Sequence, residues 1–191
     1  MNWLDVSRIT DMSMLFRNTK FNGDISKWDV FNVKDMTEMF SASTFNGDIS
    51  NWNVSNVESM DLIFGEGSEF NGDISNWNVS HVKDFTLAFS NSKFNGDISN
   101  WNTRSATSMA GMFSGSIFNG DLSKWNVSKV RTFSMMFMDS QFNNESLFNW
   151  KIGKNADLDG IFTKSNISVN MLTKLFEKWK IELTIEHITE P

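Results

Sequence analysis

The sequence contains no cysteine and no tyrosine, and its only proline is the last residue, Pro191. The missing cysteine excludes disulfides, thiolate metal sites and thiol catalysis. The net charge of −6 argues against a general nucleic-acid-binding surface, which would be basic. The two histidines, His81 and His187, lie far apart in the sequence, and neither has the neighbours of a catalytic triad or a metal site. We therefore expect a protein that is not an enzyme and that holds no cofactor and no metal.

Long hydrophobic runs are also missing. No apolar run approaches the roughly 18 residues that a membrane-spanning helix needs, so no membrane insertion is expected. The N-terminal segment MNWLDVSRITDM lacks the basic and apolar regions of a signal peptide. As it stands, the chain is expected to be cytoplasmic or phage-encoded. If it is a fragment of a longer protein, a cell-surface location is expected instead.

The sequence is instead rich in apolar aromatic residues that repeat. Tryptophan recurs at intervals of 24 or 25 residues, at positions 3, 28, 52, 77, 101, 125 and 150. A phenylalanine follows about 12 residues after each tryptophan, and a second aromatic position precedes an Asn-Gly-Asp corner in five repeats. Extra residues fall near Leu4, within 65–69 and within 143–149, where corners tolerate insertions. This pattern predicts about seven stacked coils.

Within a coil, the spacing of apolar residues predicts two elements. Trp28 and Val30 alternate with polar neighbours, which is typical of a short strand over 25–30. Apolar residues at 33, 36, 39 and 40 have helical spacing and predict a short helix or 3₁₀ turn. Ser55 begins a capping-box pattern, and equivalent serines, expected to act as N-caps, stand at 7, 80 and 128. The Asn-Gly-Asp glycine is expected to supply a positive φ. The predicted class is α/β, a leucine-rich-repeat-like solenoid of parallel strands and short helices.

The two ends of the chain differ. The solenoid is expected over 1–165 and a C-terminal cap over 166–191, with Ser168 capping a helix over 169–180 and an edge strand over 181–185. Trp3 already belongs to the repeat, so the first coil has no cap. An open coil is a self-complementary patch, and a head-to-head homodimer is one hypothesis for how it is covered. The alternatives are a truncated chain or a segment 1–5 that folds over the end.

Three repeating columns each have two interpretations. The tryptophans form either a core column, which their polar neighbours favour, or an exposed platform for sugars or bases. The aspartates either cap turns or hold calcium, and one carboxylate a coil is few for calcium; they are Asp24, Asp48, Asp73, Asp97 and Asp121. The asparagines at 22, 46, 71, 95, 119 and 143 predict an internal hydrogen-bonded ladder.

The residues on either side of the tryptophans are the candidate binding face, because they point outward if tryptophan points inward. Amide side chains adapt to protein or glycan partners. An ordinary solvated face is the alternative. The candidate residues are Lys27, Asp29, Asn51, Asn53, Asn76, Asn78, Asn100, Asn102, Lys124 and Asn126.

The coil FNGDISNWNVSNVESMDLIF and its copies resemble the BspA-like bacterial surface-protein repeat, over residues 1 to about 165. That family is common among mycoplasma surface lipoproteins and also occurs in phage proteins. The resemblance implies a solenoid that serves adhesion or protein interaction, and it carries no catalytic residues. The chain lacks the signal or lipobox cysteine of the usual surface member.

Four functions follow in order of preference. The first is a non-enzymatic, adhesin-like module that binds a protein or a glycan. The second is a small intracellular or phage-encoded inhibitor of a host protein, and the third is an assembly piece that self-associates through its first coil. The last is a hydrolase, for which the sequence offers no pair of carboxylates in different environments.

Overall fold

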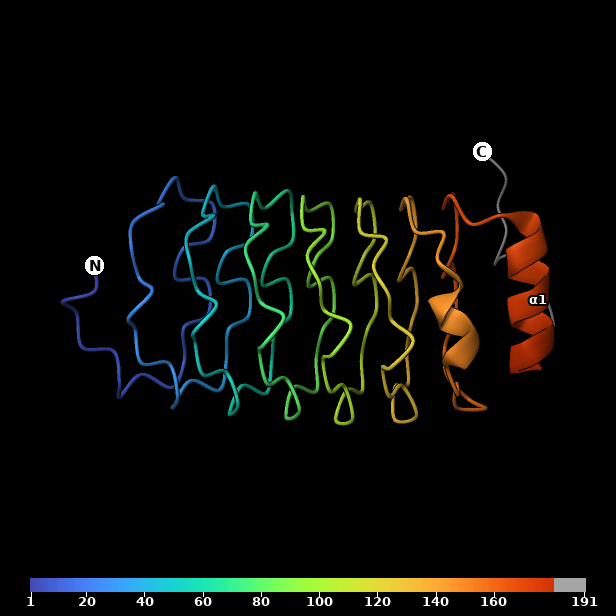
Figure 1. Ribbon diagram of the computed structural model, residues 1–191, viewed down its shortest axis with the longest axis horizontal. Coiled ribbons are helices and arrows are strands. Elements are labelled where there is room, and N and C mark those ends of the chain that lie inside the picture. Colours follow the sequence, from blue (N-terminus) through green and yellow to red (C-terminus); the bar gives the residue numbers. More distant parts are fainter. Residues whose placement is uncertain (181–191) are drawn as a thin grey trace.

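The chain winds through successive coils that stack along one axis, as the computed structural model shows for residues 1–180 (Figure 1). In this part of the chain the only helices are the 3₁₀ helix η1, Glu145–Asn149, and the α-helix α1, Val169–Trp179. Isolated parallel bridges connect equivalent residues of neighbouring coils, at 11, 35, 59, 84, 108, 132 and 157, without forming named strands. The predicted α/β class, with a strand and a helix in each coil, is therefore wrong.

The predicted strand over 25–30 is a pair of turns. The backbone N–H of Trp28 donates to the carbonyl of Ile25 at 3.1 Å, and Val33 N–H donates to Val30 at 3.0 Å. Trp28 and Val30 are nevertheless buried while their neighbours are exposed. The alternation does correspond to a burial pattern, but it arises between turns rather than along a strand.

The predicted helix over 33–40 is also a run of turns. Met39 N–H donates to Met36 at 3.1 Å, and Glu38 between them has a φ of 57°. Such a left-handed residue at the third position defines a type II turn and ends any helix. The N–H groups of Met36, Glu38 and Phe40 donate to the next coil instead of to the residue four positions back. Apolar residues at i, i+3 and i+4 therefore reach one face without a helix.

The predicted helix caps are turns closed by a different side chain. Ser55 does not accept a bond as an N-cap; its N–H donates to Oδ1 of Asn53 at 3.2 Å. The same bond, from serine N–H to the residue two positions earlier, is made by the other predicted caps, Ser7, Ser80 and Ser128. These are Asx turns, in which the side-chain oxygen of the Asp or Asn two positions before the serine accepts the hydrogen bond.

The glycine of the Asn-Gly-Asp corner has a packing role rather than a positive φ. A Cβ on Gly47 would lie 2.9 Å from the ring of Phe45. The left-handed glycines are elsewhere, at 67, 111, 115 and 160.

Backbone hydrogen bonds hold each coil to the next. In the first coil the N–H groups of Met12, Met14, Phe16 and Asn18 donate forward to carbonyls of the second coil, at 2.8–2.9 Å. The equivalent residues of the second to sixth coils repeat these bonds, with the exception of Glu66. Two flanking rows run in the opposite direction, as when Lys34 N–H donates back to Thr10 and Thr44 N–H to Thr19. The stack thus has a direction, because its four central rows all point their N–H groups toward the C-terminal end.

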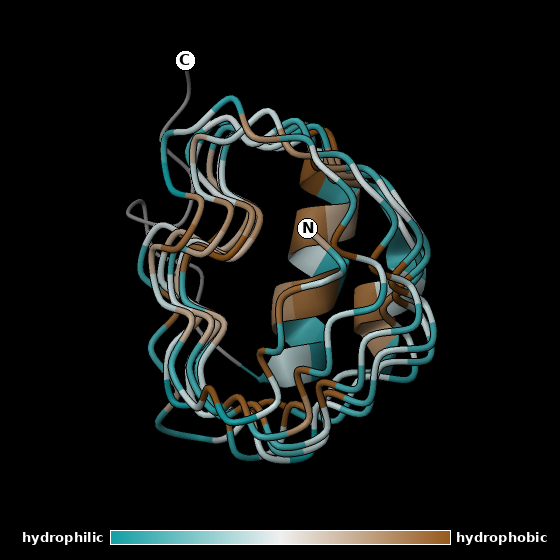
Figure 2. Ribbon diagram, turned by 90° about the vertical axis from the view of Figure 1, so that its left-hand side faces the viewer, coloured by the Kyte–Doolittle hydropathy of each residue, from teal (hydrophilic) through white to brown (hydrophobic). Residues whose placement is uncertain are grey.

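Aromatic side chains fill the interior of the stack, and Figure 2 shows its coils from the N-terminal end. Trp28 and Trp52 stack with ring centroids 6.4 Å apart, and Phe40 and Phe45 stack at 4.5 Å. The indole N–H of Trp52 donates to the carbonyl of Ile25 in the preceding coil at 3.1 Å. Tryptophans 77, 101, 125 and 150 repeat this bond. The core interpretation is confirmed for these buried tryptophans.

The first coil is in a different register from the one predicted. Leu4 N–H donates to Met1, and the Trp28 indole donates to the same Met1 carbonyl, the bonds that Ile25 accepts from Trp28 and Trp52. Leu4 therefore takes the tryptophan position, and Trp3 takes that of Lys27. No extra residue is present near Leu4. Trp3 is 84% exposed and does not belong to the buried column, contrary to the prediction.

Helix α1 covers the last coil, and the sequence predicted it within one residue. Ser168 accepts from Met171 N–H at 3.2 Å, and Lys180 ends the helix with a left-handed φ of 57°. The helix buries Met171, Leu172, Leu175 and Phe176.

The predicted edge strand over 181–185 and His187 lie outside the described residues. In residues 1–180 no helix has the length and apolar character to cross a membrane.

We predict that Trp77→Ala and Trp3→Ala have very different costs. Loss of the buried Trp77 ring leaves a cavity and removes one of the two hydrogen bonds that the Ile49 carbonyl accepts, and should lower the free energy of unfolding by about 3–5 kcal/mol. Trp3 is exposed, so its loss should cost less than about 0.5 kcal/mol. Urea unfolding measures both. Similar costs for the two variants would contradict the register of the first coil.

Candidate functional site

The predicted binding face is a real surface of the stack. All ten candidate residues are exposed, and the tryptophans between them are buried. One column precedes the tryptophans and contains Lys27, Asn51, Asn76, Asn100 and Lys124. The other follows them and contains Asp29, Asn53, Asn78, Asn102 and Asn126. We call the two columns together the amide face. Whether it binds a partner stays a prediction.

The two columns are not chemically equivalent. Each residue of the following column accepts the backbone N–H two positions later, at 3.1–3.3 Å, so its oxygen closes the coil's own turn. In the preceding column, Asn100 accepts from Lys124 Nζ at 2.7 Å. Within residues 1–180, the side-chain amides of Asn51 and Asn76 make no hydrogen bond. The preceding column therefore offers the free donors and acceptors.

The amide face is longer than predicted. Because Trp3 is in register with Lys27, its exposed indole stands at the N-terminal end of the preceding column. At the other end, a concavity of about 380 Å³ is lined by Lys124, Asn126, Asn149 and Lys151, among others. The sequence contained a signal for Trp3, since Phe16 lies 12 residues after Leu4 rather than after Trp3.

The aspartate column closes turns, as its structural interpretation predicted. Each carboxylate accepts the backbone N–H of the serine two positions later, as Asp24 does from Ser26 at 3.0 Å. These bonds favour the ionised form and lower the pKa of Asp24 to about 2, with Asn2 contributing. No group of three or more potential metal ligands occurs in the described part of the chain.

The asparagine column is a ladder between coils, as predicted. Oδ1 of Asn22 accepts the backbone N–H of Asn46 at 2.9 Å. The same bond continues through 71, 95, 119 and 143.

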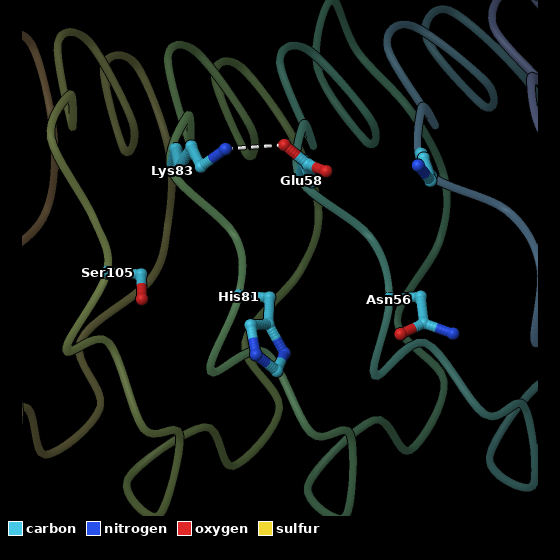
Figure 3. A pocket seen from close by; sticks show the side chains of 6 residues that line it. Asn56, Glu58, His81, Lys83 and Ser105 are labelled. Carbon is cyan, nitrogen blue, oxygen red and sulfur yellow. Dashed lines mark hydrogen bonds and ion pairs between the residues drawn. The ribbon is translucent and has the colours of Figure 1, made fainter.

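His81 is part of another column, and its interpretation as an isolated surface histidine is incomplete. Asn32 and Asn56 each donate through the side-chain amide to a carbonyl of the preceding coil at 2.8 Å. His81 Nδ1 lies 2.8 Å from the equivalent Ser55 carbonyl, so the imidazole replaces an amide. Its surroundings form an open pocket of about 300 Å³, at whose edge Lys83 pairs with Glu58 (Figure 3). The hydrogen bond of His81 thus has a structural role, which is to join its coil to the preceding one.

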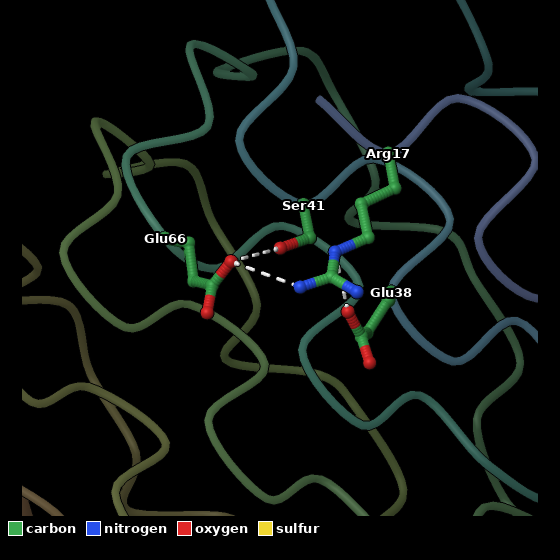
Figure 4. Close-up of polar contacts among 4 residues, drawn as sticks. All are labelled: Arg17, Glu38, Ser41 and Glu66. Atoms are coloured by element: carbon green, nitrogen blue, oxygen red, sulfur yellow. Dashed lines mark hydrogen bonds and ion pairs between the residues drawn. The ribbon is translucent and has the colours of Figure 1, made fainter. Parts of the chain in front are cut away.

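A second charged cluster joins three coils. Nε of Arg17 lies 2.7 Å from Glu38, and its guanidinium also lies 3.8 Å from Glu66, which accepts from Ser41 Oγ (Figure 4). Glu66 lies in the insertion over 65–69. The cluster ties this insertion to the first two coils, and its carboxylates are already paired.

Asp61 is a partly buried carboxylate at a position where most coils have an uncharged residue. Its position is a hydroxyl residue in four other coils, at 13, 37, 86 and 134. Thr37 and Thr86 pair there with Ser59 and Ser108 at 2.9 and 2.7 Å. One oxygen of Asp61 is buried and has no hydrogen-bond partner. Burial, with the negative charges of Asp84, Glu38 and Asp35, raises the pKa of Asp61 to about 6.

Comparison with known proteins places the coils in one family. A family model described as "Mycoplasma protein of unknown function, DUF285" matches residues 1–93 and again 88–179. No curated protein and no solved structure matches the chain. The match agrees with the mycoplasma repeats that the sequence resembles, and it does not test the BspA-like name.

We predict that Asp61→Thr stabilises the protein at neutral pH. The carboxyl binds its proton more tightly in the folded state, so its contribution to stability is complete below pH 4 and is lost as the pH rises through about 6. The gain at pH 7 should be on the order of 1–2 kcal/mol, since solvent screens part of the shift. Urea unfolding between pH 4 and 7 measures it.

Asp159→Thr is the matched control, because Asp159 occupies the same column but is exposed. It should leave the pH dependence between 4 and 6 unchanged. An Asp61→Thr variant with the pH dependence of the parent would show that this carboxyl is not the cause.

Proposed function

We propose that this chain, which belongs to the DUF285 family of mycoplasma proteins, is a non-enzymatic interaction module that binds a protein or glycan partner through the amide face. The observation that carries the proposal is the free preceding column. Asn51 and Asn76 are exposed and make no hydrogen bond of their own within residues 1–180. A partner can engage these amides without disrupting the fold.

The neighbouring residues support a binding role. An exposed tryptophan is a frequent energetic centre of protein interfaces, because it buries a large rigid ring at little entropic cost. Trp3 is 84% exposed at one end of the column. The concavity beside Lys124 and Lys151 adds a shaped, positively charged feature at the other end. The turn-closing following column keeps the surface rigid, which lowers the entropic cost of binding.

An adhesin-like role at the cell surface is the first form of this proposal. The family's mycoplasma origin supports it. The second form is an intracellular or phage-encoded inhibitor that uses the same face on a host protein. The two differ in the compartment of the partner, not in the binding residues.

The test is a pull-down with immobilised protein, offered separately to envelope and cytosolic fractions of the source or host cell. Trp3→Ala and the double variant Asn51→Ala/Asn76→Ala should each lower retention of a specific partner at least tenfold, the loss expected for about 1.4 kcal/mol of binding energy. None of these side chains is buried, so folding should be unchanged.

Gln141→Ala and Asn155→Ala serve as controls, since both amides are exposed and lie off the amide face. They should retain the partner at the parent's level. An envelope partner supports the adhesin form and a cytosolic partner the inhibitor form. Equal retention by all variants would refute the amide face as the binding surface.

A further inference from the structure

We infer that the outer edge of the first coil docks the N–H edge of another coil of this repeat, head to tail, and that α1 prevents the chain from docking onto itself. The surface concerned is the end of the stack, not the amide face. The inference therefore stands without the proposed binding function.

The first coil presents a row of free carbonyls. In the later coils, the residues equivalent to Asp11, Ser13, Leu15 and Arg17 accept backbone N–H groups from the coil before, with the exception of Ser90; in the second coil these are Asp35, Thr37, Met39 and Ser41. In the first coil no donor is present for these four carbonyls among residues 1–180. All four peptide groups point the same way, so the edge is a row of acceptors only.

Donors flank this row on both sides. Lys34 and Thr44 N–H groups donate backward in the second coil, and Asn46 N–H donates to the Asn22 side chain. Their equivalents in the first coil are the N–H groups of Thr10, Lys20 and Asn22, which have no acceptor within the described chain. Along the chain, this edge therefore presents one free N–H group, then four free carbonyls, then two more free N–H groups.

Apolar side chains at this edge are exposed only because no coil covers them. Ile9 is 37% exposed while its equivalent Val33 is fully buried, and Leu15 is 46% exposed while its equivalent Met39 is fully buried. A docked coil would bury both, as each internal interface already does. The partner that fits is thus one that reproduces the internal interface.

This polarity argues against the head-to-head homodimer expected from the sequence. A two-fold axis would place the acceptor row of one copy against the acceptor row of the other. Unpaired carbonyls buried against each other cost about 1–3 kcal/mol apiece. Only an edge that presents N–H groups complements the row.

The C-terminal end of the stack is such an edge, and α1 covers it. The N–H groups of Leu158, Gly160, Phe162 and Lys164 continue the four forward rows, and none donates to a described residue. Helix α1 packs on this end through buried Leu172 and Leu175, and Trp179 stacks on Phe162 at 6.4 Å. The helix buries apolar surface, and its interior carbonyls are already bonded within the helix, so α1 covers the N–H edge without pairing with it.

The experiment exposes the N–H edge in the full chain. Leu172→Asp/Leu175→Asp should undock α1, and the weight-average mass by light scattering should rise with concentration to several times 21.9 kDa. The parent chain should stay monomeric. Adding parent chain to the variant should shorten the assemblies, because the parent offers an acceptor edge but no N–H edge. Circular dichroism establishes that the variant is folded.

A blocking variant identifies the edge. Leu15→Asp places a charge at a position that is exposed in the single chain and would be buried in the assembly. Combined with the α1 substitutions, it should abolish assembly; in the parent it should change nothing.

Should the α1 variant fail to fold, a protease site placed between Ser165 and Ser168 releases α1 after folding. A folded chain with α1 released that stays monomeric would overturn the inference. So would assembly that Leu15→Asp does not affect, or a parent chain that dimerises in a Leu15-dependent way.

Discussion

The rows of hydrogen bonds between coils are the constraint on which the rest of the structure depends. Alternate peptide groups of each coil must point their N–H along the stack, and this is possible because left-handed residues such as Met14, Glu38 and Leu62 recur in the turns. A left-handed non-glycine residue costs roughly 1–2 kcal/mol. Each coil therefore depends on its neighbours, whose hydrogen bonds and aromatic stacking offset that strain. A single coil on its own would lack the interactions that offset this strain, so we expect it not to adopt this backbone conformation.

The same constraint separates side chains by role. The interior takes rings because successive coils place equivalent residues side by side, as with Phe40 and Phe64 at 5.6 Å. The corners take aspartate and asparagine because turns leave N–H groups that a short side chain can satisfy. Only side chains that neither fill the core nor close a turn, such as those of Asn51 and Asn76, remain available for a partner. Function is thus expected where the repeat leaves side chains uncommitted.

The sequence predicted burial and columns well but the backbone poorly. The repeat length, the tryptophan core, the asparagine ladder and α1 follow from residue type and spacing. The strand and the helix predicted in each coil are wrong. Consecutive turns place apolar residues at the same intervals as strands and helices do, so the spacing alone cannot distinguish turns from these elements. The tryptophan spacing predicts Trp3 in the buried column, whereas the register of the coils gives that position to Leu4. The amide face was located by alternation, but the engagement of Asn53 and Asn78 in turns depends on φ and ψ angles that the sequence does not contain.

The insertion over 65–69 shows how the directional rows respond to a defect. Ala42 N–H donates to Gly65, and in the following interface Glu66 makes no equivalent backbone bond, whereas Asn91 restores the row to Ser114. The extra residue breaks one row at one interface and leaves the three inner rows intact. Glu66 instead bonds Ser41 and lies beside Arg17. A side-chain contact thus stabilises the insertion where a backbone bond is lost. The outer row tolerates the defect because it borders a corner. An equal insertion among the inner rows would place Phe64 or Met60 out of register with the core.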